Sequence, residues 1–203
     1  MGSLVRRAAG VLCMVAGVCM LVCAGVMVWC NQADQDAALG ATSEVAGEVY
    51  RAIGEVAGEE LLTPGDVAEP VMPTVQIDGY DYIGYLELPT VGLTLPVMES
   101  WDYDRLKLAP CRYWGATFSD DLVIAAHNYA NHFGPIGSMR EGDPVQLVDA
   151  AGEVWRYRVA LIEVVGPYDV EGMVGADWDL TLFTCTQGGA NRVAVRCERV
   201  LAW

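Results

Sequence analysis

Three side chains of this sequence could together attack a carbonyl group. Cys185 ends a short β-prone run, TLFTC, and the polar turn after it would leave its sulfur at the rim of a sheet. A thiol becomes a nucleophile when a neighbouring group takes its proton or stabilises its thiolate. Of the two histidines, His127 closes the apolar run LVIAA at a strand end, whereas His132 lies within a loop. We therefore expect His127, rather than His132, to be the acid and base.

Arg192 adds a permanent positive charge to this group. It opens the next β-prone run, RVAVRCERV, directly after the turn that follows Cys185. In a hairpin its guanidinium would reach the rim that carries the thiol, where it could stabilise the oxyanion formed when a thiolate attacks a carbonyl. Considered alone, His127 could be a structural histidine and Arg192 a solvated arginine at a sheet edge. The spacing of the three residues favours a catalytic site.

The other cysteines have different surroundings. Four of the seven lie in or beside an apolar N-terminal run, which leaves Cys111, Cys185 and Cys197. Cys197 alternates with Val193 and Val195, so we expect it to point into the core as an unreactive thiol. A bond from Cys185 to Cys111 or Cys197 would instead describe a binding module without catalysis. No CxxC pair or Cys/His ligand spacing occurs, so we expect neither a metal nor another cofactor.

Short β-prone runs separated by turn residues make up the chain from Tyr80 onward. Seven or eight strands with few helices predict an all-β domain, a closed barrel or a sandwich. One short helix is expected within WDYDRLKLAP, residues 101–110, ended by Pro110. The runs that predict strands are YIGYLEL, LTLPVM, CRYWGATF, DLVIAAH, PVQLVDAAGEVWRYRVALIEVV, DLTLFTC and RVAVRCERV.

The N-terminal segment is long and apolar enough to cross a membrane. Residues 8–30 carry no charge, and a helix of that length covers the roughly 30 Å of bilayer hydrocarbon. Arg6 and Arg7 precede the run and Asp34 and Asp36 follow it. This order predicts a single-pass anchor with the N-terminus in the cytoplasm and the remaining chain outside the cell. A cleaved signal peptide is the alternative.

The segment between the apolar run and the strands is expected to be a linker or stalk. Val45, Val49, Ile53 and Val56 recur at helical spacing, but several glycines weaken the pattern and Pro64, Pro70 and Pro73 follow it. A marginal amphipathic helix is therefore predicted. The expected domains are a cytoplasmic tip and membrane anchor (1–30), a linker (31–79) and a catalytic barrel (80–203).

The charge balance excludes one class of partner. The 203 residues carry a formal net charge of −15, with 12 basic and 27 acidic side chains. A chain this acidic is poorly suited to nucleic acid or another polyanion. We interpret the acidity as a solvated surface and expect no nucleic-acid partner.

The motifs above resemble those of the sortases, membrane-anchored cysteine transpeptidases of mainly Gram-positive bacteria. The likeness covers about residues 80–202 and is most specific in TLFTC, in GGANRVAVRCERV and in LVIAAHN. GYLELPTVGLTLPVM resembles the opening strands of the family, and REGDPVQLVDAAGEVWRYRV resembles its central turn and hairpin.

The resemblance implies a closed eight-stranded sortase-type β-barrel with short helices. It implies that Cys185 is the nucleophile, His127 the acid and base, and Arg192 the oxyanion or substrate stabiliser, while Thr184 helps to hold the substrate backbone. The implied substrate is a surface protein or pilin with a C-terminal sorting signal of the LPxTG type. Cleavage gives a thioester, which an amine of peptidoglycan or of a pilin resolves to an amide.

The sequence departs from the family pattern in two ways. Ala126 stands before the histidine where many sortases have glycine, which bears on how closely the chain can approach there. No second apolar segment follows the last strand before Trp203, and this, with the short segment DVEGMVGADWD before TLFTC, is more similar to class D or class B than to class C. The alternatives to a transpeptidase are a hydrolytic cysteine peptidase on the same scaffold and a membrane-tethered barrel that only binds. A membrane tether suits an enzyme whose substrates emerge at the membrane, because it raises the effective concentration there.

Overall fold

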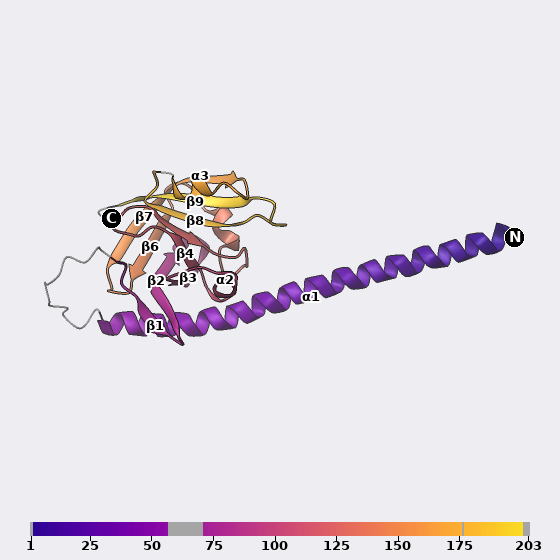
Figure 1. Cartoon of the computed structure of the whole chain (residues 1–203), viewed down its shortest axis with the longest axis horizontal. Coiled ribbons are helices and arrows are strands. Elements are labelled where there is room, and N and C mark those ends of the chain that lie inside the picture. The colour runs from indigo at the N-terminus through magenta and orange to yellow at the C-terminus, as the bar shows by residue number, and fades with distance from the viewer. Residues whose placement is uncertain (1, 57–70, 176, 201–203) are drawn as a thin grey trace. The chain divides into compact units, whose positions relative to one another are not determined.

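A computed structural model describes residues 2–56, 71–175 and 177–200, and the chain divides into two units, residues 1–37 and 38–203. The helix α1 (Gly2–Val56) runs through the boundary between them. The second unit contains all the strands (Figure 1). These strands are β1 (Val75–Ile77), β2 (Tyr80–Leu88), β3 (Leu93–Met98), β4 (Cys111–Trp114), β5 (Leu122–Ala125), β6 (Pro144–Asp149), β7 (Val154–Val165), β8 (Leu180–Cys185) and β9 (Arg192–Arg199).

The strands β2 to β9 form a closed barrel. Their order is β2-β3-β4-β5-β8-β9-β7-β6, and a pairing between β6 and β2 closes the ring, while the short β1 pairs with β2 outside it. The pairs β3–β4 and β5–β8 are parallel and the others are antiparallel. The predicted all-β, closed eight-stranded barrel is thus confirmed, and closure leaves none of its strands as a free edge.

Closure of the barrel depends on a glycine in β2. This strand pairs with β3 on one side and with β6 on the other, and the backbone of β6 comes very close to it at Gly84. Gly84 lies at the irregularity in the β2–β3 register and has a φ of 146°, which L side chains rarely adopt. A Cβ at this position would lie 2.0 Å from the carbonyl oxygen of Val148 on β6. Only glycine lets the two backbones approach this closely.

Side chains from alternate positions of the strands fill the barrel. Leu180 and Leu182 of β8 and Val195 and Cys197 of β9 are fully buried in this interior cluster. The predicted inward direction of Cys197 is therefore confirmed. The intervening residues of β8 and β9 face outward, and this alternation decides which side chains reach the outer face where the site lies.

Short helices cover parts of the barrel. The predicted helix within residues 101–110 is confirmed as α2 (Tyr103–Leu108), and the Asp102 carboxylate caps it by accepting from the backbone N–H groups of Asp104 and Arg105, each at 2.8 Å. The remaining short helices are α3 (Val170–Val174) and the 3-10 turns η1 (Pro89–Val91) and η2 (Gly134–Ser138).

A second apolar cluster lies outside the barrel, beneath residues 38–56 of α1. Val49 and Ile53, from the apolar face recognised in the sequence, are buried there with Ile77, Tyr82, Met98 and Cys111. The segment expected as a linker thus contains a packed helix as well as β1. The domain boundaries remain a prediction.

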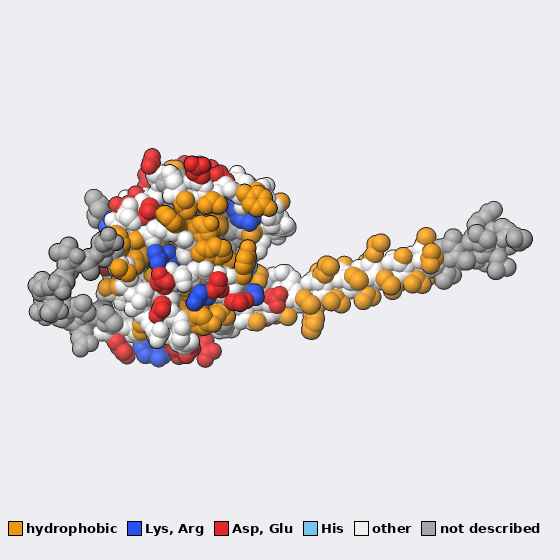
Figure 2. Space-filling view, viewed as in Figure 1, with side chains coloured by type: hydrophobic (Ala, Val, Ile, Leu, Met, Phe, Trp, Pro, Cys, Tyr) orange, Lys and Arg blue, Asp and Glu red, His pale blue; other side chains and the backbone are white. Residues whose placement is uncertain are grey.

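The part of α1 that begins at Leu12 is apolar and unburied as far as Trp29. It contains an 18-residue window of mean hydropathy 2.4, none of it buried within the structure, and Figure 2 shows hydrophobic side chains along it. By length and composition this helix could cross a membrane. A signal sequence would have the same composition, so the orientation and retention of the segment remain predictions.

Candidate active site

The hairpin of β8 and β9 brings Cys185 and Arg192 together. The two residues are direct cross-strand partners, so their side chains leave the same face of the sheet. The turn between them is closed by hydrogen bonds from Thr186 N–H to Asn191 O at 2.9 Å and from Gly189 N–H to Thr186 O at 2.8 Å. Gly188 and Gly189 supply the left-handed backbone with φ of 82° and 74°. The hairpin expected from the sequence is therefore confirmed.

The end of β5 brings His127 to the same end of the barrel. β5 is parallel to β8 with Ala125 opposite Phe183, and the Ala126 N–H donates to the Phe183 carbonyl at 3.2 Å. The Asn128 amide also donates to the Thr186 carbonyl at 3.4 Å. His127 and Cys185 each come two positions after the paired residues Ala125 and Phe183. Because the two strands are parallel, both residues therefore lie at the same edge of the sheet although they are far apart along the chain.

A cavity of about 210 Å³ contains the three predicted catalytic side chains. Cys185, His127 and Arg192 all line it. Thr184 and Ala126 also line it, and the remaining walls come from Trp101, Tyr103, Leu106, Tyr113, Pro167 and Phe183. The structure thus brings together the nucleophile, base and cation proposed from the sequence, within a largely aromatic enclosure.

The thiol of Cys185 is free and only partly buried. Cys111 and Cys197 are also free and fully buried, and burial raises the pKa of Cys111 to about 12 and that of Cys197 further. Both are therefore poor nucleophiles. Of the three cysteines outside the apolar run, Cys185 alone combines access with a neighbouring histidine.

His127 is held beside an aromatic ring. Its imidazole stacks on Tyr129 with ring centroids 4.8 Å apart and an interplanar angle of 25°. Partial burial lowers the pKa of His127 below its usual 6.5, and the positive charge of Lys107 lowers it further. At neutral pH the imidazole is therefore largely neutral and able to accept the proton of a thiol.

Arg192 is held by the turn that separates it from the cysteine. Its guanidinium donates to the carbonyls of Gly189 and Asn191, both at 3.1 Å. These bonds use only one of its two terminal nitrogens, so further N–H groups remain for an oxyanion or a substrate carbonyl. The side chain is partly exposed on the wall of the cavity.

Thr184 lies on the opposite face of β8 from Cys185. Its side chain is buried, and the hydroxyl donates to the Ala126 carbonyl at 2.9 Å. In this arrangement the hydroxyl ties the ends of β5 and β8 to each other, directly before His127. The role in holding substrate that the resemblance implies remains a prediction. Ala126 is itself buried, so the structure accommodates its methyl group at the position where many sortases have glycine.

The aromatic walls of the cavity could not be identified from spacing. Trp101, Tyr113 and Phe183 come from three different segments and form a chain, with ring centroids 5.2 Å apart for Trp101–Tyr113 and 5.3 Å apart for Tyr113–Phe183. The only sequence signal was the concentration of aromatic residues around positions 101–114. Such walls favour apolar side chains of a ligand.

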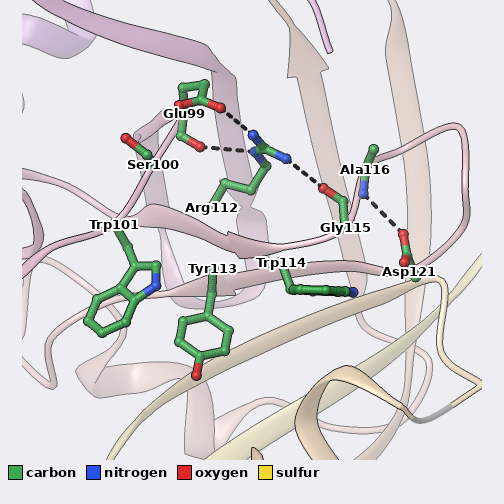
Figure 3. A pocket seen from close by; sticks show the side chains of 9 residues that line it. All are labelled: Glu99, Ser100, Trp101, Arg112, Tyr113, Trp114, Gly115, Ala116 and Asp121. Atoms are coloured by element: carbon green, nitrogen blue, oxygen red, sulfur yellow. Dashed lines mark hydrogen bonds and ion pairs between the residues drawn. The ribbon is translucent and has the colours of Figure 1, made fainter. Parts of the chain in front are cut away.

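A second hollow of about 450 Å³ adjoins the active-site cavity and shares Trp101 and Tyr113 with it. Arg112 braces this region, because its guanidinium pairs with Glu99 and also donates to the carbonyls of Glu99 at 2.9 Å and Gly115 at 3.0 Å (Figure 3). The Asp121 carboxylate accepts from the Ala116 N–H at 3.0 Å on the far side. This network holds the strand that presents Tyr113 to the cavity.

No group of three or more His, Cys, Asp or Glu side chains that could hold a metal ion occurs within residues 2–56, 71–175 and 177–200.

Comparison with known proteins places this region in a family. A family model described as the Sortase domain matches residues 86–200. Sortase A of Bacillus anthracis is 30% identical over 132 residues, which are 59% of this chain and 59% of that protein. The chain therefore spans about three fifths of the length of this curated relative.

Solved structures give the same result. Sortase C1 of Streptococcus suis aligns with a TM-score of 0.52 and 26% identity over 60% of this chain and 74% of its own. Sortase C of Clostridium perfringens, solved with the C-terminal cell wall sorting motif, aligns with a TM-score of 0.54 and 24% identity over 78% of this chain and 91% of its own. Relatives named sortase A and sortase C both match, so the expected class D or class B remains a prediction.

Proposed function

The chain belongs to the sortase family, and on that premise we propose that it is a membrane-anchored cysteine transpeptidase. The observation that carries the proposal is the convergence of the free Cys185 thiol, His127 and Arg192 on one cavity. A thiol nucleophile, a neighbouring base and a fixed cation are what acyl transfer through a thioester requires.

The first half of the reaction forms the thioester. His127 accepts the proton of Cys185, and the thiolate attacks the carbonyl carbon of the threonine in the sorting motif. The oxyanion that develops accepts hydrogen bonds from the free N–H groups of Arg192. The peptide C–N bond then breaks as His127 returns the proton to the departing amine, which leaves the acyl group on sulfur.

The second half of the reaction transfers the acyl group. An incoming amine attacks the thioester carbon and loses a proton to His127. The C–S bond breaks, and the sulfur recovers a proton from the imidazole. The product is an amide and the enzyme returns to its starting state. Water in place of the amine would give hydrolysis.

We propose that the substrate is a surface protein or pilin with an LPxTG-like C-terminal sorting signal. Two observations support this: the sortase C of Clostridium perfringens was solved with a C-terminal cell wall sorting motif, and the aromatic walls of the cavity suit apolar side chains. The acceptor is an amine of peptidoglycan or of another pilin. Thr184 is proposed to help align the substrate backbone through the strand that it secures.

The proposed location follows from the N-terminal charges. Arg6 and Arg7 precede the apolar run and Asp34 and Asp36 follow it, which favours a cytoplasmic N-terminus and an extracellular barrel. The enzyme would then meet substrates that emerge at the outer face of the membrane.

A peptide assay on the full chain in detergent micelles tests the function. We expect LPxTG-type peptides to be cleaved after threonine, a peptide adduct to appear on Cys185 by mass mapping, and added triglycine or a lysine peptide to yield a ligated product. Cys185→Ala should abolish turnover, whereas Cys30→Ala, the same change on the exposed part of α1, should not. Cleavage without ligation would indicate a hydrolase, and turnover by Cys185→Ala would rule out the mechanism.

A further inference from the structure

The loop that carries His127 is closed on itself by its own backbone. The N–H groups of His132 and Gly134 donate to the Tyr129 carbonyl at 3.0 and 2.9 Å, and the Phe133 N–H donates to the His127 carbonyl at 3.0 Å. A Cβ on Gly134 would lie 2.6 Å from the Tyr129 carbonyl oxygen, so glycine is required for this compact turn. The position of His127 is therefore tied to that of residues 129–134.

The second histidine lies behind the first in this loop. His132 is completely buried and packs against Tyr129 with ring centroids 5.5 Å apart, while the Tyr129 ring stacks on His127 at 4.8 Å. The Tyr129 ring thus contacts both imidazoles. The packing of His132 therefore bears on the position of His127 through the Tyr129 ring that both contact.

A single hydroxyl group from α1 holds His132 in place. The buried Thr42 Oγ1 lies 2.8 Å from the Leu108 carbonyl oxygen and 3.0 Å from His132 Nε2. A carbonyl can only accept, so the hydroxyl proton goes to Leu108, and Nε2 must then carry a proton and donate to Oγ1. Thr42 therefore selects the neutral Nε2–H tautomer, which agrees with the fall in the pKa of His132 to about 4 on burial.

The same hydroxyl reaches a wall of the active-site cavity. Leu108 is the last residue of α2, the helix that contributes Tyr103 and Leu106 to the cavity. One threonine side chain thus bonds both to the helix that shapes the cavity and to the loop that carries the base.

From these contacts we infer that Thr42 and His132 are positioning residues for His127. The inference rests on the proposed function, because it assigns them the task of holding the catalytic imidazole at the angle that accepts the Cys185 proton. Neither residue touches the reacting atoms. The buried Thr42 hydroxyl joins three segments through these two bonds, and a shift of any one segment would break a bond whose loss leaves the Leu108 carbonyl or the Nε2–H unpaired.

Matched variants of the full chain in detergent micelles test this role. Thr42→Val keeps the shape and removes both hydrogen bonds. We expect kcat for peptide transfer to fall about 10- to 100-fold while KM changes less than about threefold, because a small displacement of a catalytic group acts mainly on the chemical step. Thr42→Ser should restore kcat. Ser43→Ala, the next residue on an exposed face of α1, should leave kcat unchanged.

A second pair of measurements separates positioning from stability and from the proposed function itself. His132→Phe keeps the contact with Tyr129 but loses the N–H, so it should reproduce the loss, and the double variant with Thr42→Val should lose little more than either single variant. The imidazole NMR signal of His127 should move in Thr42→Val and return in Thr42→Ser. Wild-type kcat and an unmoved signal in a folded Thr42→Val variant would overturn the inference. If the wild type transfers no peptide, the proposed function fails, and the NMR signal still decides whether Thr42 positions His127.

Discussion

The two histidines of the chain show how the surroundings of a side chain decide its role. His127 is partly exposed on the wall of the cavity, whereas His132 is fully buried and bridged to Thr42. The sequence distinguished them by place, because one closes an apolar run and the other lies in a loop. Their contact through Tyr129 could not be predicted, since it depends on how the loop folds back and on a threonine 90 positions away from His132.

The pH dependence of activity follows from the environment of His127. Because burial and the charge of Lys107 lower its pKa, the neutral imidazole persists to lower pH than in a free histidine. We expect kcat/KM for sorting-peptide cleavage to rise through an acid limb whose midpoint lies below pH 6.5. Lys107→Met removes the second cause and should move that midpoint slightly upward. A midpoint above 6.5 in the wild type would contradict the prediction.

The β8–β9 hairpin and the parallel pair β5–β8 together bring the residues of the site to one end of the barrel. Strand alternation in RVAVRCERV indicated the inward direction of Cys197, and the polar turn after TLFTC indicated the place of Cys185 at the end of a strand. Alternation also places Thr184 inside, where its hydroxyl bonds to Ala126. The pairing of β5 with β8 could not be read, because strands distant in sequence pair according to the complementarity of their faces.

The outer face of the same hairpin secures α3. Arg196 of β9 is 2% exposed, and it donates to Glu163 on β7 at 2.9 Å, to the Thr181 hydroxyl on β8 at 3.1 Å and to the Gly172 carbonyl of α3 at 2.9 Å. A buried cation with three acceptors from three elements fixes how they pack.

Replacing this arginine should therefore affect both stability and substrate binding. We expect Arg196→Met to lower the free energy of unfolding by about 2–3 kcal/mol, because the buried Thr181 hydroxyl loses its partner and Glu163 loses its ion pair. KM for the sorting peptide should rise, since the segment before α3 supplies Pro167 to the cavity. Urea unfolding and peptide kinetics measure the two effects.

Arg158→Met provides the matched control. This arginine lies on the neighbouring strand β7 with an exposed side chain that donates to the Gly142 carbonyl at 2.9 Å. The change should cost less than about 1 kcal/mol. Equal destabilisation by the two variants would show that burial of Arg196 is unimportant.

At the scale of the molecule, the second unit contains two separate apolar clusters. One fills the barrel, and the other lies between the barrel and residues 38–56 of α1, around Val49, Ile53 and Cys111. The sequence indicated only a marginal helix here, because glycines lower helix propensity. Burial of Val49 and Ile53 stabilises the helix in spite of them, since most helical stability in proteins comes from packing of an apolar face.

Thiol labelling tests whether this packing protects Cys111. Val49→Asp would bury a charge against the barrel, so we expect residues 38–56 to detach and Cys111 to become accessible. Its alkylation rate should rise at least about tenfold, because loss of burial also lowers its pKa from about 12 and increases the thiolate fraction. Peptide mass mapping after timed alkylation identifies the labelled cysteine.

The control for this experiment is also in α1. Leu39 is 54% exposed, so Leu39→Asp introduces the same charge without opening the cluster and should leave Cys111 protected. Cys197 lies inside the barrel and should stay protected in both variants. Protection of Cys111 in Val49→Asp would mean that α1 does not shield it.

The amino-acid sequence by itself determined the short strands, the hairpin after Cys185, the places of His127 at a strand end and of His132 in a loop, and the apolar N-terminal helix. These depend on alternation, turn residues and helical length, which are properties of neighbouring residues. Only the tertiary structure decided the closure of β2 against β6, the proximity of β5 to β8, the aromatic walls of the cavity and the bridge from Thr42 to His132. Each of these joins residues far apart in the chain, and such contacts form where shapes fit and buried donors find acceptors.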